Sequence, residues 1–411
     1  TFLINGKYDS PMSDEKHSAW NPGLEADIPA AYQELETLYR PENVTSSYSD
    51  VVEASTQTGL SHQELVTFRP ERLAVHELLI RVTANIMVVE GEDERDLGWE
   101  FRTIASDILA QYIQPRMKEI TQTHTDLHRR VRRMVKVQLG STLFQTRTPT
   151  RKKRGLFAFL SRTRSDKSPV ATETIEEREN RAIFAYKKMG QTADDELEIA
   201  VFKSLYRVLN SIAATRGYIG PDQPFLADLV CTHVCNTHGS RLIGRLMESW
   251  IEEAIAEKKY SRVLNTPAPV LISLKGASAA GKSSLRVMLE KTLKDQGIYA
   301  SSFATISPDI WRRFLLDYES LGEAYKYAGR MTSNEVMVID GKLDRYIREK
   351  SNRDQSLPHL LVDRFRFDSF SSEKVGKILH GTYVQHVNVL QMYFIITPPE
   401  LTVERGWERG L

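Results

Sequence analysis

One stretch of the chain, Val270 to Leu285, has residue types and spacing that could bind a phosphate group. Its residues Gly276 to Ser283 match G-x-x-x-x-G-K-[ST], with an apolar run before them and a helical pattern after them. Small side chains let backbone N–H groups turn inward around an anion, and the helix N-terminus adds partial positive charge. A glycine-rich turn that matches by chance is the competing interpretation, but the flanking patterns favour nucleotide binding.

The residues of this stretch have separate expected roles. Lys282 places a positive charge against the β- and γ-phosphates of a nucleoside triphosphate, and the Ser283 hydroxyl can ligate Mg²⁺. The expected nucleotide-binding set is the loop and the start of the helix: Gly276, Ala277, Ser278, Ala279, Ala280, Gly281, Lys282, Ser283 and Ser284.

The elements that position this loop alternate between strand-like and helix-like patterns from residue 268 onward. The strand candidates are Val270–Leu274, Ile298–Thr305, Pro358–Val362 and Met392–Ile396. The helical stretches are Ser283–Gln296 and Asp309 to about Lys350, with breaks near Gly322 and Gly329. Such alternation predicts an α/β parallel sheet of the P-loop NTPase type, with helices on both faces and ligands beyond the carboxyl ends of the strands.

Acidic residues occur where this arrangement requires them. Asp309 follows the second strand and could accept a proton from a substrate hydroxyl, while Arg312 holds a phosphate or substrate anion. Asp363 follows a buried strand, where a second group that orients Mg²⁺ is expected. A helix cap at Asp309 with Arg312 as its surface partner is the alternative interpretation.

Four further arginines are candidates for contacts with substrate. Arg364 and Arg366 alternate with aromatic residues and could reach the substrate anion, although structural ion pairs explain them equally well. Arg405 and Arg409 are four residues apart on an expected helix, so they share a face and could present cations to the transferring phosphoryl group. Pairing with nearby glutamates is the competing explanation.

The remainder of the chain reads as an irregular N-terminal arm, residues 1–68, with one short helix around Ala30 to Tyr39, followed by an α-helical domain, 69–262. Within that domain His76 and Glu77 are interpreted as a satisfied structural pair rather than a catalytic one. Cys231, Cys235 and His238 would share a helix face, but burial of free cysteines is favoured over a metal site, because a second ligand segment is lacking.

Basic residues dominate residues 129–167, centred on the sequence RKKRGLFAFLSR that begins at Arg151. Cations beside apolar side chains between Arg151 and Arg164 suit an anionic membrane surface or a polyanion. A solvated linker is the favoured interpretation, since charge runs usually serve solubility.

Composition limits the class of protein. The chain has 411 residues, a net charge of +1, 41% hydrophobic residues and two cysteines, which excludes a disulfide framework and a strong global field. No apolar run approaches about 20 residues, and no signal-peptide pattern begins the chain. We expect a soluble cytoplasmic protein, with secretion by a route without a cleavable signal left open. We also expect a fragment whose sheet domain, 268–411, is incomplete at its C-terminus.

The segments GASAAGKSS, SPDIWRRF and TPPELTVERGWERG together resemble the zeta-toxin group of P-loop kinases over residues 268–411. That resemblance implies transfer of the ATP γ-phosphate to a hydroxyl of a UDP-linked amino sugar, with ATP and Mg²⁺ bound. It implies that Asp309 is the general base, that Arg312 lies near the substrate, and that Arg405 or Arg409 is a lid arginine. Arg313 and Phe314 stand where the family usually has a His-Pro pair, which leaves the acceptor open.

These observations predict an ATP- and Mg²⁺-dependent phosphotransferase acting on a small molecule. Two alternatives remain: a nucleotide-dependent switch that acts through the helical domain on a protein partner, and a nucleic-acid end kinase that uses the basic stretch.

Overall fold

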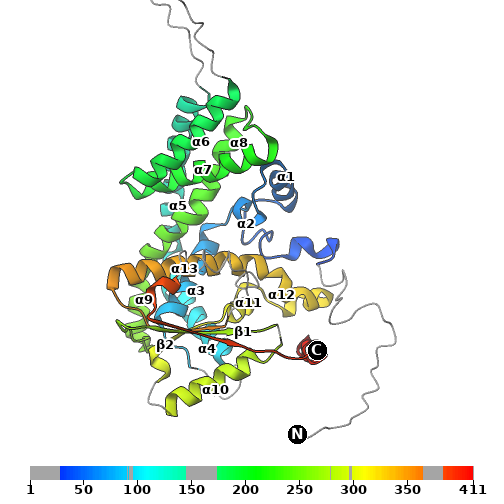
Figure 1. Ribbon diagram of the computed structural model, residues 1–411, viewed down its shortest axis with the longest axis vertical. Coiled ribbons are helices and arrows are strands. Elements are labelled where there is room, and N and C mark those ends of the chain that lie inside the picture. The colour runs from blue at the N-terminus through cyan, green and yellow to red at the C-terminus, as the bar shows by residue number, and fades with distance from the viewer. Residues whose placement is uncertain are drawn as a thin grey trace, which may run out of the picture. The chain divides into compact units, whose positions relative to one another are not determined.

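The computed structural model describes residues 28–89, 91, 96–144, 174–277, 279–295, 299–363 and 383–410. These residues fall into two compact units (Figure 1). The sheet unit comprises residues 28–43, 74–117 and 244 onward. The helical unit comprises residues 44–73 and 118–243.

The helical unit is built from helices with clear local start and stop signals. Thr174 forms a capping box with Glu177, and Gly217 ends a helix with a φ of 81°. The apolar residues Leu197, Val201, Leu205, Val208 and Ile212 recur at helical spacing, and their side chains are buried. The helices are α1 (Tyr48–Thr58), α2 (His62–Leu65), α5 (Met117–Thr142), α6 (Ile175–Thr192), α7 (Glu196–Arg216), α8 (Gln223–Val234) and the π-helical turn η5 (Cys235–Gly239).

The interval expected to be irregular contains α1 and α2. Ser47 caps α1 by accepting a hydrogen bond from the Asp50 N–H, and Gly59 ends it at a φ of 68°. These caps specify a helix that the polar composition of this interval conceals. Residues 1–27 lie outside the described part of the chain.

Cys231 and Cys235 are buried free thiols. Burial raises the pKa of each thiol to about 12, so both stay protonated at neutral pH. Arg151 to Arg164 lie outside the described residues. No helix in the described ranges is long and apolar enough to cross a membrane.

The sheet unit contains the predicted parallel sheet. Its strands are β1 (Val270–Lys275), β2 (Phe303–Ile306), β3 (His359–Asp363) and β4 (Val389–Phe394), in the order β2-β3-β1-β4. Each neighbouring pair is parallel. In Figure 1 the sheet lies between α13 on one side and α10 on the other. All four carboxyl ends therefore meet at one edge, as the alternating pattern predicted.

Helices surround this sheet and supply its hydrophobic cover. Ile272, Leu274, Phe303 and Leu361 form a cluster against which leucines of α10 pack. The helices before β1 are η2 (Ala30–Leu35), α3 (Pro70–Asn85), α4 (Asp96–Ile108), the π-helical turn η3 (Leu109–Ile113), η4 (Gln114–Arg116) and α9 (Ser240–Lys258). After β1 they are α10 (Lys282–Asp295), η6 (Ala300–Ser302), η7 (Pro308–Trp311), α11 (Arg312–Leu315), η8 (Glu319–Tyr327), α12 (Ala328–Met331), α13 (Ser333–Asp354), η10 (Tyr383–His386) and α15 (Pro399–Gly410).

Several element boundaries differ from the sequence-based expectation. The second strand is confined to Phe303–Ile306, because a 3₁₀ turn occupies the residues before it. The fourth begins at Val389, three residues before its predicted start. The long helical section breaks at Gly322, where φ is 54° and ψ is −125°, as expected.

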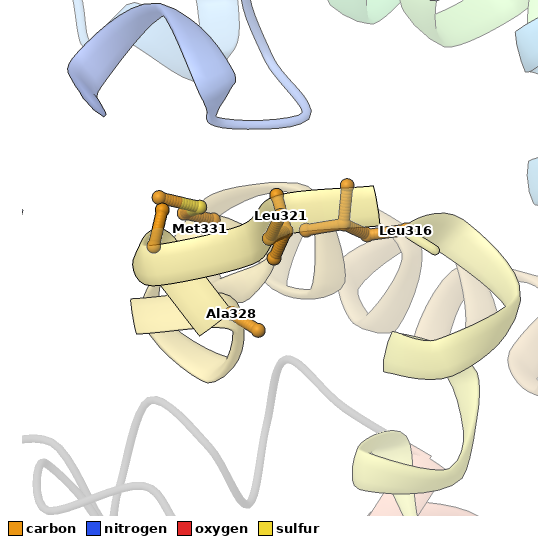
Figure 2. Packing of buried hydrophobic residues seen from close by; sticks show 5 residues of the cluster. Leu316, Leu321, Ala328 and Met331 are labelled. Atoms are coloured by element: carbon orange, nitrogen blue, oxygen red, sulfur yellow. The ribbon is translucent and has the colours of Figure 1, made fainter. Parts of the chain in front are cut away.

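The segment from η8 to α12 has a small core of its own. Figure 2 shows Leu321, Ala328 and Met331 on its short helices, together with Leu316, which directly follows α11. Tyr32 and Leu35 of η2 pack against this core. The backbone N–H of Thr37 also donates to the Met331 carbonyl at 3.0 Å, so η2 and the residues after it brace the segment that leads into α13.

Candidate functional site

The glycine loop, Gly276–Ser283, connects the carboxyl end of β1 to the N-terminus of α10. Gly281 has a φ of 97°, a conformation that other residues rarely adopt. The Lys282 ammonium donates to the carbonyls of Gly276 and Ala277, at 3.3 and 2.9 Å. The lysine therefore folds back over its own loop, where its charge is available to an anion. Ser278 lies outside the described residues.

The chain after β4 holds the loop from its other side. The Ile395 N–H donates to the Lys275 carbonyl at 2.7 Å, and the Thr397 hydroxyl donates to the Ala280 carbonyl at 3.0 Å. A Cβ added to Gly276 would lie 3.0 Å from the Ile395 carbonyl oxygen. Only glycine therefore fits at the start of the loop without displacing the backbone beside it.

Asp363 ends β3, the strand next to β1, and pairs in register with Leu274. Its Oδ2 lies 3.1 Å from Nη1 of Arg286 on α10, and both side chains are buried. The same Nη1 is 3.4 Å from the hydroxyl of Ser307, the residue after β2. Sequence reasoning placed Asp363 at this edge but missed Arg286. Its position four residues after Lys282, on the same face of the helix, was the available signal.

Asp309 lies in η7, directly after β2, and its side chain is 74% exposed. Its Oδ1 lies 2.7 Å from Nε of Arg312. The Arg312 Nη1 also donates to the hydroxyls of Thr332 and Ser333, at 2.8 and 3.1 Å. Arg312 thus joins the acid to the N-terminus of α13. Asp309 and Arg312 are brought together as an ion pair, the contact that the alternative interpretation gave to Arg312.

Trp311 anchors the turn that carries Asp309. Its indole is fully buried, and its Nε1–H donates to the Thr83 hydroxyl on α3 at 3.2 Å. Gly98 of α4 approaches the same turn, since a Cβ added there would lie 3.7 Å from Cγ2 of Ile310. Residues far earlier in the chain therefore fix the position of the acid.

The remaining candidate residues are only partly described. A Cβ on Gly281 would lie 3.8 Å from Nη1 of Arg405, so this guanidinium lies beside the glycine loop. Arg409 lies on the same helix, α15, but its side chain is outside the described set. Arg364 and Arg366 also lie outside the described residues.

Tyr318 lies close to Asp309, Arg312 and Arg313, whose charges act on its hydroxyl. Burial raises the pKa of its hydroxyl, while the charges of Arg312 and Arg313 act in the opposite direction. The negative charge of the Asp309 carboxylate raises the pKa of the same hydroxyl. Tyr318 is therefore a neutral hydrogen-bonding group close to the candidate base at neutral pH.

Comparison of the chain with protein-family models, curated proteins and solved structures finds no match.

Proposed function

We propose that this chain is a Mg²⁺-dependent phosphotransferase that moves the γ-phosphate of ATP to a hydroxyl of a small molecule, as its resemblance to zeta-toxin-like P-loop kinases implies. The observation that carries the proposal is the meeting of three groups at one sheet edge. The glycine loop follows β1, Asp363 ends the adjacent β3, and Asp309 follows β2. A loop alone suits any nucleotide-binding protein, whereas an acid after β2 adds a candidate for proton transfer.

The glycine loop fits a bound triphosphate in shape and charge. Its start admits only glycine beside the Ile395 carbonyl, Gly281 has the φ that turns the chain, and Lys282 lies over the loop. Arg405 adds a second cation beside Gly281. These cations neutralise charge on the transferring group, which is the main contribution a protein makes to this reaction.

Mg²⁺ fits the oxygen donors at the same edge. The Ser283 hydroxyl would be its protein ligand, and Asp363 would act through water, because Arg286 already occupies its Oδ2 at 3.1 Å. When bound, the ion neutralises phosphate charge and orients the phosphates for in-line attack. Ser283 is the second residue of α10, so its position is fixed by the first turn of the helix that follows the loop.

Asp309 is the general base of the proposed reaction. The acceptor oxygen bonds to the γ-phosphorus, the bond from that phosphorus to the β–γ bridging oxygen breaks, and the acceptor proton passes to Asp309. Arg312 orients the carboxylate through its 2.7 Å contact and is itself fixed by Thr332 and Ser333. Exposure of Asp309 leaves room for an acceptor to reach it.

The test is transfer of label from γ-³²P-ATP into sugar nucleotides, oligonucleotides and a metabolite extract. Asp309→Asn should abolish transfer and leave ATP affinity within about twofold, because the loop is untouched. Glu323→Gln is the matched control, since it neutralises an exposed acid in η8 and should leave transfer unchanged. Full transfer by Asp309→Asn would refute the assignment of the base.

A second candidate function is a nucleotide-dependent switch. The ion pair between Arg286 and Asp363 favours it, because it links the helix after the glycine loop directly to β3. A switch would bind ATP with the same residues but label no acceptor, and Asp309→Asn would then change nothing. Labelling of oligonucleotide ends alone would instead identify a nucleic-acid kinase.

A further inference from the structure

Arg102 of α4 lies beside the turn that carries Asp309. A Cβ added to Gly98 would lie 3.0 Å from Nη1 of Arg102 and 3.7 Å from Cγ2 of Ile310, so the guanidinium and the turn flank the same point. Arg102 is half-buried, and among the described residues it forms no hydrogen bond or ion pair with an acid. A half-exposed guanidinium without a carboxylate partner can form charge-assisted hydrogen bonds to an anion from solution.

A second arginine, Arg313, acts on the same region from the turn after Asp309. Its Nη2 donates to the Tyr325 hydroxyl at 3.2 Å, and its guanidinium lies 5.0 Å from the ring centre of Tyr318. Burial lowers the pKa of Arg102, and the charge of Arg313 lowers it further. The charge of Arg313 is therefore close enough to act on Arg102, and two neighbouring cations favour the binding of a shared anion.

The space beside Arg102 can admit a ligand. A shallow depression, open to solvent, extends along one face of α4 and is lined by Trp99, Arg102, Thr103, Ser106 and Asp107. The carboxylate of Asp107 lies at the far end of this face, where it accepts from the Tyr260 hydroxyl at 2.7 Å and faces Lys258 at 3.3 Å. Its charge is therefore compensated, and the uncompensated positive end of the depression is at Arg102.

We propose that Arg102 and Arg313 form a second anion-binding site, distinct from the glycine loop, that holds a phosphate or carboxylate group of the acceptor beside Asp309. The identification of the ligand as the acceptor rests on the proposed function, whereas the binding of an anion at this site does not. Arg102 belongs to residues 74–117, far outside the segment that resembles P-loop kinases. The flat indole of Trp99, three residues before Arg102, provides an exposed apolar surface for the neutral part of the same molecule.

Inorganic phosphate, titrated into the full chain by calorimetry, tests the site without any requirement for catalysis. The Lys282→Ala variant removes the lysine of the glycine loop, so that binding elsewhere is measured. In that background Arg102→Gln and Arg313→Gln should each weaken phosphate binding about tenfold, the size expected for a lost charge-assisted contact. Lys326→Gln is the matched control, because it removes one exposed positive charge from neighbouring η8 and should have no effect.

Unchanged phosphate affinity in both arginine variants would overturn the site, whatever the outcome of the kinase assay. If phosphate binding depends on these arginines, acceptor assays decide the occupant. An acceptor that carries an anion should show a KM about tenfold higher with Arg102→Gln, while the KM for ATP stays constant. An unchanged acceptor KM would overturn the acceptor assignment. If the wild-type chain transfers phosphate to none of the acceptors tested, the proposed function is refuted instead.

Discussion

The imidazole of His76 and the carboxylate of Glu335 lie 2.7 Å apart, with neither side chain exposed to solvent. The Lys342 ammonium lies 3.0 Å from the other ring nitrogen, Nδ1. Since lysine donates to Nδ1, the ring proton is on Nε2 and is donated to Glu335. This buried network connects α3 to the first turns of α13. Glu335 is two residues after Ser333, whose hydroxyl accepts a hydrogen bond from Arg312. Residues of α3 that the sequence identifies as structural therefore help to position α13, and through it Arg312 and the candidate base Asp309.

We expect His76→Leu to lower the free energy of unfolding of the sheet unit by about 3 kcal/mol, because Glu335 would lose a hydrogen-bonding partner in a buried site. His76→Gln should lose less, since its amide can still donate. Urea unfolding followed by circular dichroism measures both values. Equal losses in the two variants would mean that packing volume, not hydrogen bonding, determines the effect.

Lys342 predicts a specific dependence of stability on pH. Burial lowers the pKa of its ammonium from 10.5 to about 7 in the folded chain. Between about pH 7 and pH 10.5 the unfolded chain therefore binds more protons at this residue than the folded chain does. The contribution of Lys342 to stability should rise with pH across this window, by up to about 1.4 kcal/mol per pH unit.

Comparison with Lys342→Met isolates this contribution, because the variant lacks the titrating group. Thermal unfolding between pH 7 and 10 should show a steeper rise for the wild type than for Lys342→Met. The exposed lysine variant Lys326→Met should keep the wild-type slope. Parallel curves for wild type and Lys342→Met would show that Lys342 titrates alike in both states.

The buried ion pair between Arg286 and Asp363 predicts strong coupling. Asp363→Asn would leave the Arg286 guanidinium buried without its charged partner, at a cost of about 3–5 kcal/mol. The double variant Arg286→Met with Asp363→Leu should lose much less than the sum of the single variants, by a double-mutant cycle in urea. Additive losses would contradict the pairing. A raised Mg²⁺ requirement for nucleotide binding in Asp363→Asn would separately support its proposed role near the metal.

Local patterns predicted the parts of the site that lie within one strand–loop–helix unit. The glycine loop and Asp363 follow strands, and strand positions are readable from apolar runs bounded by turn residues. The same patterns predicted the parallel sheet, which the structure confirms. The α1 helix was missed because its evidence is in two caps rather than in an apolar stripe.

Long-range partners could not be predicted from one sequence. Thr83 supports Trp311 across 228 positions, and His76 meets Glu335 across 259. No periodicity encodes which helix will face which strand once the chain folds. Residues 74–117 read as helices from their pattern, but their place in the unit that contains the sheet depends on packing that only the structure supplies.

Gly276 provides a test of the glycine loop that leaves all charged groups intact. A Cβ at this position would meet the Ile395 carbonyl oxygen at 3.0 Å and the Ala280 Cβ at 3.3 Å, so Gly276→Ala must displace either the loop or the chain after β4. We expect ATP affinity to fall at least tenfold, because the N–H groups of the loop would no longer converge on a phosphate. The expected loss of stability is smaller, about 1–2 kcal/mol.

Gly341→Ala is the control for this substitution. Gly341 lies within α13, where an added Cβ would meet no atom within 4 Å, so alanine should stabilise the helix by about 0.5–1 kcal/mol and leave ATP binding unchanged. Equilibrium binding of a fluorescent ATP analogue compares the two variants. If Gly276→Ala binds the analogue as tightly as Gly341→Ala does, the glycine loop does not form the nucleotide site, and Lys282 and Ser283 lose their proposed roles with it.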